Sequence, residues 1–152
     1  MKRPWFVACL TIGLDQLAKF AIRSCLHPTQ SIPVIPSVLH LTYVQNTGAA
    51  FGLFRGHPGV FLLLSVVVAA WIVLELVRRR PHARSTEVGL ALILGGAIGN
   101  VVDRLRFGYV IDFLDVRVWP VFNLADSAIT IGVALLLLGQ FGLFRRFRPF
   151  RR

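Results

Sequence analysis

The sequence predicts an all-α membrane protein: a four-transmembrane-helix bundle with a small extracytoplasmic β element and a short interfacial helix. Of the 152 residues, 55% are hydrophobic and 16% are charged, with a mean hydropathy of +0.67. Soluble domains have about 45–50% apolar and about 25% charged residues. Four apolar stretches are long enough to cross about 30 Å of hydrocarbon as helices. Most of the basic residues behind the net charge of +10 flank these stretches, as is typical of membrane proteins.

Each predicted span is a run of about 20 mostly apolar residues. The four spans cover about residues 5–23, 58–77, 86–105 and 124–144. The first resembles a signal peptide, because Lys2 and Arg3 precede its apolar run. However, Asp15 and Lys19 interrupt that run, and no small-x-small cleavage site follows it. We therefore expect a retained helix and a single integral membrane domain over residues 1–152.

The distribution of basic residues predicts the orientation of the chain. With four spans, 11 of the 17 lysines and arginines fall on one side: Lys2, Arg3, Arg78, Arg79, Arg80, Arg84, Arg145, Arg146, Arg148, Arg151 and Arg152. The positive-inside rule places this side, and with it both termini, in the cytoplasm. Topology and anionic lipid headgroups also explain the arginine-rich C-terminal end, so we expect membrane lipids and no nucleic acid as partners.

Two loops are then extracytoplasmic, over about residues 24–57 and 106–123. The longer loop contains Ser31–Gln45, which is rich in β-branched residues and prolines. This composition predicts a small, irregular β element outside the membrane. Residues 49–54 are expected to form the short interfacial helix. The second segment, which includes Tyr109–Phe113, is predicted as a loop.

Ionisable residues at span depth need a partner or a function, because inserting such a charge costs about 2.5–3.5 kcal/mol. In the first span, Asp15, Lys19 and Arg23 follow one another at intervals of four and share one helix face. Either Asp15 and Lys19 form a structural ion pair that orients the helix, or this face supports a site on the outer side.

The third span ends in a polar cluster. Gly95 and Gly99 form a small-xxx-small face that lets another helix approach closely. Asn100, Asp103 and Arg104 share one face at the outer end of the span. This cluster either caps and packs the helix, with Arg104 extending to the interface, or belongs to a functional site.

Two aspartates precede or begin the fourth span. Asn123 is a favourable N-cap residue, and Asp126 occupies the third helical position, where its carboxylate can reach back to the cap. Asp126 therefore has a structural explanation as well as a functional one. Asp112 lies between two large apolar residues, where a solvated loop carboxylate is hard to justify. Asp115 occupies a more ordinary loop position and is expected to be solvated.

The available side chains limit the chemistry. The four histidines form no HExxH motif and the two cysteines form no CxxC motif, so we expect no metal and no cofactor. A Ser/Lys dyad would need Lys19, which already has Asp15 as a partner. Asp112 and Asp126 remain, both near the outer membrane boundary. Two close carboxylates share a proton, so that one activates water while the other polarises a carbonyl. This is the logic of an aspartic protease, and it does not fix the substrate.

Four motifs resemble those of the bacterial lipoprotein signal peptidases (signal peptidase II), a family of four-span aspartic proteases. They follow one another along nearly the whole chain: Asp15-Gln-Leu-Ala-Lys19, Asn46-Thr-Gly-Ala-Ala-Phe51, Gly95-Gly-Ala-Ile-Gly-Asn-Val-Val-Asp-Arg104 with Gly108-Tyr-Val-Ile-Asp-Phe113, and Phe122-Asn-Leu-Ala-Asp126. Each motif alone is a weak signal, and together they are specific. The chain departs from the family at Ala18, where Ser or Thr is frequent, and at Gly52, where Ser is frequent. Neither position belongs to the aspartate pair.

The resemblance implies an endopeptidase that removes the signal peptide from diacylglyceryl-modified prolipoproteins by cleaving before the lipidated cysteine. It implies that Asp112 and Asp126 are the catalytic pair. It also implies residues that bind substrate or stabilise the site: Asp15, Lys19, Asn46, Asn100, Asp103, Arg104 and Asn123. We expect a monomer in the bacterial inner membrane, with its active site near the extracytoplasmic face.

Two other classes of protein remain open from the residues alone. Intramembrane Asp, Lys and Arg also mark ion pathways, so a small membrane transporter or channel subunit with an intramembrane polar path is the main alternative. This alternative fits less well, because the polar residues are concentrated on one side of the membrane and do not form a path through it. A purely structural assembly subunit is the weaker alternative.

Overall fold

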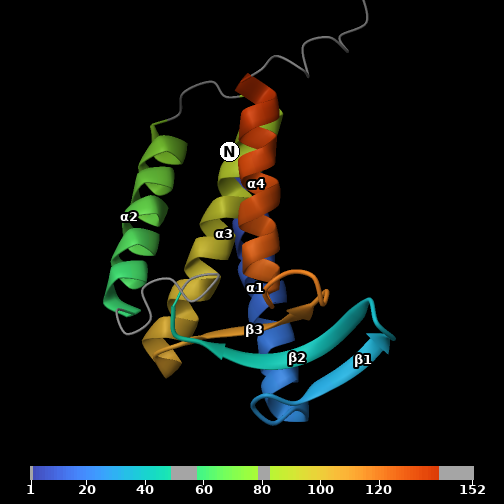
Figure 1. Cartoon of the computed structure of the whole chain (residues 1–152). Helices are drawn as coiled ribbons and strands as arrows, with labels where there is room; N and C mark the ends of the chain where they lie inside the picture. Colours follow the sequence, from blue (N-terminus) through green and yellow to red (C-terminus); the bar gives the residue numbers. More distant parts are fainter. Residues whose placement is uncertain (1, 49–57, 79–82, 141–152) are drawn as a thin grey trace, which may run out of the picture.

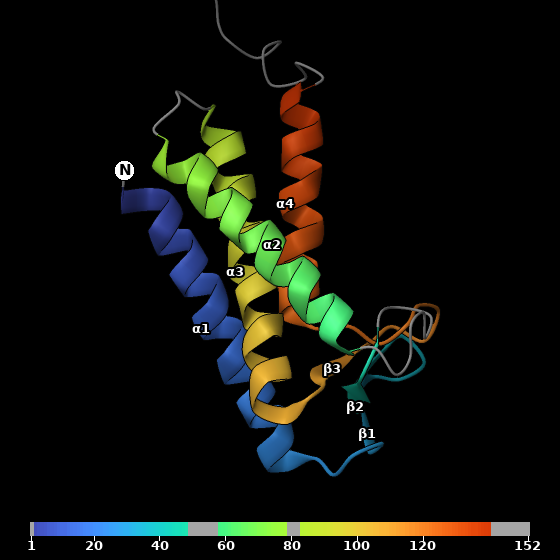
Figure 2. The ribbon, with the colours of Figure 1, turned by 90° about the vertical axis from the view of Figure 1, so that its left-hand side faces the viewer.

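The computed structural model describes residues 2–48, 58–78 and 83–140. Within these ranges the elements follow in the order α1 (Lys2–Cys25), β1 (Ser31–Ile35), β2 (Leu39–Asn46), α2 (Pro58–Val77), α3 (Arg84–Phe107), β3 (Val110–Asp115) and α4 (Leu124–Gln140). The helices form a bundle, and the strands form a small sheet at one end of it (Figure 1). The N-terminal end of α1 lies at the opposite end of the bundle (Figure 2).

The stretches predicted as spans are helical wherever they are described. α2 has the predicted bounds, and α1 and α3 are a few residues longer than predicted at each end. The last predicted residues of the fourth span, 141–144, and the predicted interfacial helix at 49–54 lie outside the described residues. In the described part of the chain, α1 and α3 are long and apolar enough to cross a membrane, whereas the apolar stretches Leu62–Val77 and Leu124–Gly139 are shorter. The count of four spans therefore stays a prediction.

The sheet has the order β1-β2-β3, and both strand pairs are antiparallel. β1 and β2 confirm the β element predicted within Ser31–Gln45. The prediction of a loop over 106–123 is wrong for the segment that forms β3. This strand is buried on both faces except at Leu114. It therefore lacks the alternation of apolar and polar residues by which a half-buried strand is recognised.

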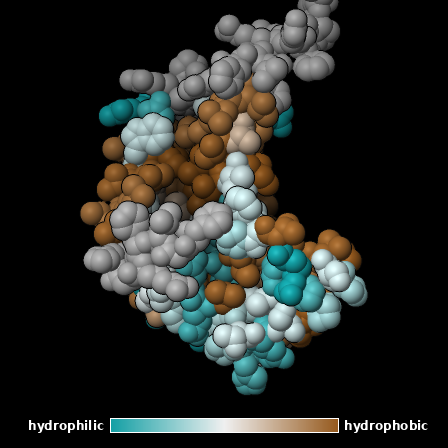
Figure 3. Space-filling model, viewed as in Figure 1, coloured by the Kyte–Doolittle hydropathy of each residue, from teal (hydrophilic) through white to brown (hydrophobic). Residues whose placement is uncertain are grey.

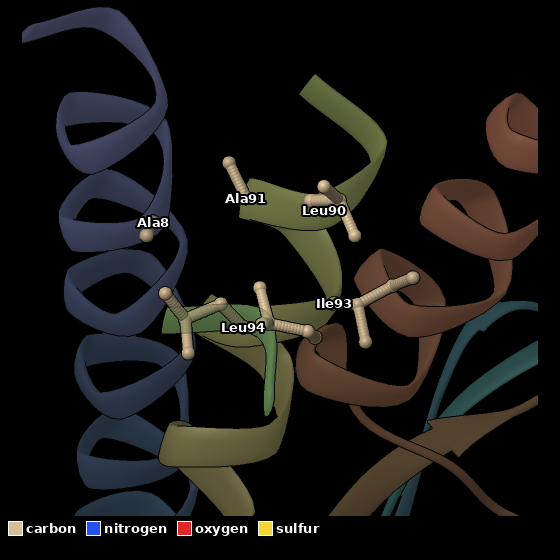
Figure 4. Close-up of a cluster of buried hydrophobic side chains, with 6 residues drawn as sticks. Ala8, Leu90, Ala91, Ile93 and Leu94 are labelled. Carbon is tan, nitrogen blue, oxygen red and sulfur yellow. The ribbon is translucent and has the colours of Figure 1, made fainter. Parts of the chain in front are cut away.

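α3 is the central helix and contacts α1, α2 and α4. Its buried Leu94 belongs to one hydrophobic cluster with Ala8 of α1 and Ile72 of α2. Figure 4 shows this cluster, in which Ile93 points from α3 toward α4. The bundle is therefore organised around α3, and the position of this helix controls where its polar outer end lies.

Glycines on two sides of α3 let its neighbours approach closely. A Cβ atom at Gly95 would lie 2.8 Å from a backbone oxygen of α1, and one at Gly96 would collide with the backbone oxygen of Ala125 in α4. One turn further along, a Cβ atom at Gly99 would lie 2.6 Å from a carboxylate oxygen of Asp15. The predicted small-xxx-small face is confirmed, and at Gly99 it brings α1 into contact with the polar cluster.

Large apolar side chains cover the outward faces of the helices. On α1, Phe6, Leu17 and Phe20 are 67%, 65% and 69% exposed. Hydrophobic residues gather over the helices, and hydrophilic ones gather at the end that carries the sheet (Figure 3). Soluble monomers rarely expose an apolar surface of this extent. The helical faces are therefore suited to contact with lipid tails.

Replacing Gly96 with alanine should destabilise the protein, because the new methyl group collides with the backbone of α4. We expect a loss of about 1–3 kcal/mol in the free energy of unfolding, as for other overpacked cores. Gly13→Ala is the matched control: Gly13 is also helical, but a Cβ atom there meets nothing within 4 Å. The control should be neutral or gain up to about 1 kcal/mol from helix propensity. Thermal unfolding in detergent measures both, and equal unfolding temperatures would contradict the packing account.

Candidate active site

The first aspartate of the predicted pair lies within β3. α3 ends at Phe107, and Gly108 adopts a left-handed conformation (φ 78°) that turns the chain toward the strand. Asp112 then pairs with Val44 of β2 and is only 2% exposed. Because water is largely excluded, the neighbouring groups determine the charge of this carboxyl.

The segment before α4 brings the second aspartate to the same place. The N–H of Phe122 donates to the carbonyl oxygen of Leu114 at 3.1 Å, and the N–H of Leu114 donates to the carbonyl oxygen of Phe122 at 2.7 Å. This pairing holds Asn123 beside β3, so α4 begins there. Asp126 lies in the first turn of α4, where the positive end of the helix dipole favours its negative charge.

Asn123 links the two carboxylates. Its Nδ2 donates to Asp112 Oδ1 at 2.7 Å, and its Oδ1 accepts the backbone N–H of Asp126 at 2.9 Å. Asp126 Oδ2 in turn accepts the backbone N–H of Asn123 at 3.3 Å. The predicted N-cap and its reciprocal partner at the third helical position are confirmed. The same capping residue also holds the other aspartate.

Two further asparagines donate to the carboxylates. Asn46 lies opposite Val110 in the β2–β3 pair, diagonal to Asp112, and its Nδ2 donates to Asp112 Oδ2 at 2.8 Å. Asn100 of α3 donates from its Nδ2 to Asp126 Oδ1 at 2.9 Å. Each of the four carboxylate oxygens therefore accepts a hydrogen bond from a neutral amide.

A buried lysine lies behind these amides. Lys19 Nζ contacts Asp15 Oδ2 at 2.8 Å, Asp103 Oδ2 at 2.9 Å and Asn100 Oδ1 at 2.9 Å. The lysine is 1% exposed and both aspartates are 0% exposed. Asp15 and Asp103 also accept backbone N–H groups from α4 and β3. The cluster therefore joins α1, α3, α4 and the sheet.

The two aspartates line a cavity of about 370 Å³ between the sheet, α3 and α4. Its other lining residues include Asn46, Asn100, Arg104, Trp119, Ile129 and Thr130. Arg104 interacts electrostatically with both carboxylates of the pair. A larger cavity of about 470 Å³ lies at the opposite end of the bundle, and its lining holds Arg3, Arg84 and Glu87 but no pair of carboxylates. The smaller cavity is therefore the candidate active site.

The pKa of Asp112 is raised from 3.8 to about 7, first by burial and second by the charge of Asp126. Hydrogen bonds from Asn46 and Asn123 act in the opposite sense, because they stabilise the ionised carboxylate. At neutral pH both forms of Asp112 are therefore populated. A group poised in this way can give and take a proton at low cost.

All nine residues that the sequence predicts for the site meet in one network of hydrogen bonds and ion pairs. Five of them line the cavity, Asn123 lies beneath the aspartates, and Asp15, Lys19 and Asp103 lie behind. The predicted ion pair of Asp15 with Lys19 is confirmed. In the described part of the chain, no three His, Cys, Asp or Glu side chains gather as metal ligands.

The guanidinium of Arg23, the third charged residue of the helix face that carries Asp15 and Lys19, lies 4.2 Å from the ring centroid of Phe107. One expectation for a charged residue is wrong. Asp115 is not solvated: it ends β3, is 7% exposed, and accepts hydrogen bonds from Thr42 and Arg117. The predicted exposure of Asp115 is wrong because the sequence predicts a loop where β3 forms.

Sequence reasoning also misses Gln16 and the segment before α4. Gln16 Nε2 donates to Asp103 Oδ1 at 2.9 Å and to the carbonyl oxygen of Gly99 at 3.1 Å. Its position beside Asp15 in an apolar run is a signal that could have identified it. Trp119 and its neighbours line the cavity through a chain reversal that leaves no periodic pattern in the sequence.

Comparison with known proteins identifies the family. The protein-family model described as signal peptidase (SPase) II matches residues 7–142 of this chain. This chain belongs to the signal peptidase II family. A lipoprotein signal peptidase of Moorella thermoacetica is 54% identical over 131 residues, covering 86% of this chain and 87% of the relative. One of Halothermothrix orenii is 47% identical over 134 residues, covering 88% and 92%.

Two solved structures, both described as bacterial membrane enzymes, have the same fold. One has a TM-score of 0.88 at 28% identity and covers 100% of this chain and 95% of its own. The other has a TM-score of 0.83 at 30% identity and covers 92% and 93%. This signal peptidase II family member is thus a membrane enzyme and an aspartic peptidase. None of these similarities supports the transporter or channel alternative.

The raised pKa of Asp112 predicts how stability depends on pH. The neutral carboxyl stabilises the fold below about pH 4, and this contribution is lost as the pH rises through about 7. We expect wild-type stability in detergent to fall between pH 5 and 8 by up to a few kcal/mol more than that of Asp112→Asn. Thermal unfolding at both pH values measures this difference in slope. Parallel pH dependence of the two proteins would contradict the assigned pKa.

Proposed function

We propose that this enzyme removes the signal peptide from diacylglyceryl-modified prolipoproteins by hydrolysing the peptide bond before the lipidated cysteine. Membership of the signal peptidase II family supports this activity, as do relatives named lipoprotein signal peptidase at 54% and 47% identity. The single observation that carries the proposed mechanism is the contact of Asn123 with both aspartates. This shared contact supports the proposal that both carboxyl groups act on one substrate bond.

In the proposed mechanism, Asp126 is the base and Asp112 holds the shared proton. The helix N-terminus favours the ionised form of Asp126, whereas burial favours the neutral form of Asp112. Asp126 takes a proton from water as the water oxygen attacks the carbonyl carbon. Asp112 gives its proton to the carbonyl oxygen, which yields a neutral tetrahedral diol. Asp126 then protonates the leaving nitrogen, the C–N bond breaks, and a hydroxyl proton of the diol returns to Asp112.

The remaining polar residues of the site hold this geometry. Asn46, Asn100 and Asn123 fix the carboxylates as donors, and Arg104 supplies positive charge beside them. Asp15, Lys19 and Asp103 support the site from behind. These roles rest on preorganised hydrogen bonds, which need no rearrangement as the charge shifts during the reaction.

The proposed membrane arrangement has four spans, both termini in the cytoplasm and the aspartates near the extracytoplasmic boundary. In the described part of the chain, the ends of α1, α2 and α3 away from the sheet carry Lys2, Arg3, Arg78 and Arg84, and these basic residues support this orientation. At such a boundary the lipid-modified substrate stays in contact with the bilayer while its scissile bond meets water. We propose that the enzyme acts as a monomer in the bacterial inner membrane.

Asp112→Asn and Asp126→Asn should each lower kcat by on the order of 10³-fold or more, because either change removes the shared proton chemistry. The assay follows loss of the signal peptide from a diacylglyceryl-modified prolipoprotein by purified enzyme in detergent. Glu87→Gln is the matched control, since Glu87 is a half-buried carboxyl at the opposite end of α3. It should retain the wild-type rate. Unchanged cleavage by either folded aspartate variant would refute the dyad.

The proposed orientation predicts that the two native cysteines differ in accessibility. Cys25 ends α1 near the sheet and is exposed, whereas Cys9 lies within the predicted span. In intact cells, a membrane-impermeant maleimide should label the Cys9→Ala variant at Cys25 and leave the Cys25→Ala variant unlabelled. Labelling of Cys25 only after lysis would place this end in the cytoplasm and reverse the topology.

A further inference from the structure

Three asparagines turn their amide nitrogens toward the two aspartates. Asn46 and Asn123 donate to Asp112, and Asn100 donates to Asp126. An asparagine side chain can rotate by half a turn and present its oxygen in place of its nitrogen. An amide oxygen that faced a carboxylate would be repelled by it. A contact on the far side of each amide fixes its nitrogen toward the aspartates.

For two of the three, the backbone supplies this constraint. The N–H of Gly48 donates to Asn46 Oδ1 at 3.0 Å, and the N–H of Asp126 donates to Asn123 Oδ1 at 2.9 Å. A backbone N–H can only donate. The oxygen of each amide is therefore fixed toward the backbone and its nitrogen toward Asp112.

Asn100 is held by a side chain instead. Its Oδ1 accepts from Lys19 Nζ at 2.9 Å and from Asn123 Nδ2 at 3.2 Å. An ammonium group has three donors and no acceptor. Rotation of Asn100 would place its NH₂ group against Lys19 and its oxygen against Asp126, which is unfavourable at both ends.

We propose that Lys19 is a positioning residue: its ammonium group fixes the Asn100 amide so that this amide donates to Asp126. This inference rests on the proposed function of the aspartate pair. It assigns Lys19 a role that is more specific than structural support of the helix. Lys19 itself has little freedom, because Asp15 and Asp103 hold its other two donors. Gln16 in turn holds Asp103.

Lys19 also acts on Asp112 directly through its charge, so a test must separate the charge from the hydrogen bond. The double variant Asp15→Asn, Lys19→Met removes one negative and one positive charge. It leaves the net charge of the Asp15, Lys19 and Asp103 cluster at −1, as in the wild type. Asp15→Asn alone keeps the Lys19–Asn100 contact but brings the charge of this cluster to 0, so the added Lys19→Met change still removes one positive charge. An Asn100→Ser background, in which Lys19 has no amide to hold, controls for that loss of charge.

The first experiment is a double-mutant cycle on kcat and KM with the diacylglyceryl prolipoprotein substrate. Added to Asp15→Asn, Lys19→Met should lower kcat roughly ten- to a hundredfold, the usual effect of losing a charge-assisted hydrogen bond, with KM nearly unchanged. In an Asn100→Ser background the same addition should change kcat less than about threefold. An equal loss in both backgrounds would overturn the proposal. Absence of cleavage by the wild type would instead overturn the proposed function.

The second experiment does not depend on activity. In ¹⁵N-labelled protein in detergent, the side-chain amide signal that disappears in Asn100→Ser belongs to Asn100. We expect one of its protons to resonate downfield in the wild type and in Asp15→Asn, because that proton is bonded to Asp126. In the Asp15→Asn, Lys19→Met variant the downfield shift should be lost. A downfield proton that persists there would show that Asn100 is oriented without Lys19 and would overturn the proposal.

Discussion

Burial of Lys19 is the constraint on which the rest of the site depends. An ammonium group removed from water is strongly destabilising unless its charge is matched, and Lys19 is matched by two carboxylates and an amide oxygen. Two carboxylates around one ammonium group leave a net negative charge, and neutral hydrogen-bond donors stabilise it. These donors are the N–H groups of Ala125 and Ile111 and the amide of Gln16. They come from α4, β3 and α1, so the cluster forms only when helices and sheet are together in place.

The geometry of the aspartate pair depends on this cluster around Lys19. Asp112 lies on a strand and Asp126 on a helix, and the pairing of Leu114 with Phe122 joins these two elements. The small residues of α3 decide how closely α1 and α4 approach, and thereby whether the polar atoms of the cluster come within hydrogen-bonding distance. Sites built on regular elements hold their geometry better than sites built on loops. The outward faces of the same helices are apolar, so the polar cluster lies beside surfaces that are suited to contact with lipid tails.

The sequence predicts the helices well, because long apolar runs have few alternative structures. It also predicts the partners of Asp15 and Asn123, since helical spacing and capping are local rules. It fails at β3, where burial on both faces removes the alternating pattern, and consequently at Asp115. The contacts of Asn100 with Lys19 and Asp126 join residues far apart in the chain, and only the packing of three helices creates them. The cap interpretation of Asp126 and its proposed catalytic role are compatible, because Asn123 caps α4 through Asp126 and also contacts Asp112.

The central claim is that Asp112 and Asp126 form a coupled pair that holds one proton near neutral pH. Titration of the five aspartates by ¹³C NMR of their carboxyl carbons, in detergent, tests it most directly. The account predicts one carboxyl that titrates near pH 7 and is absent from the Asp112→Asn spectrum. If every carboxyl titrated below about pH 5, in the ordinary range for aspartate, the pair would be fully ionised at neutral pH and the proposed mechanism would be contradicted.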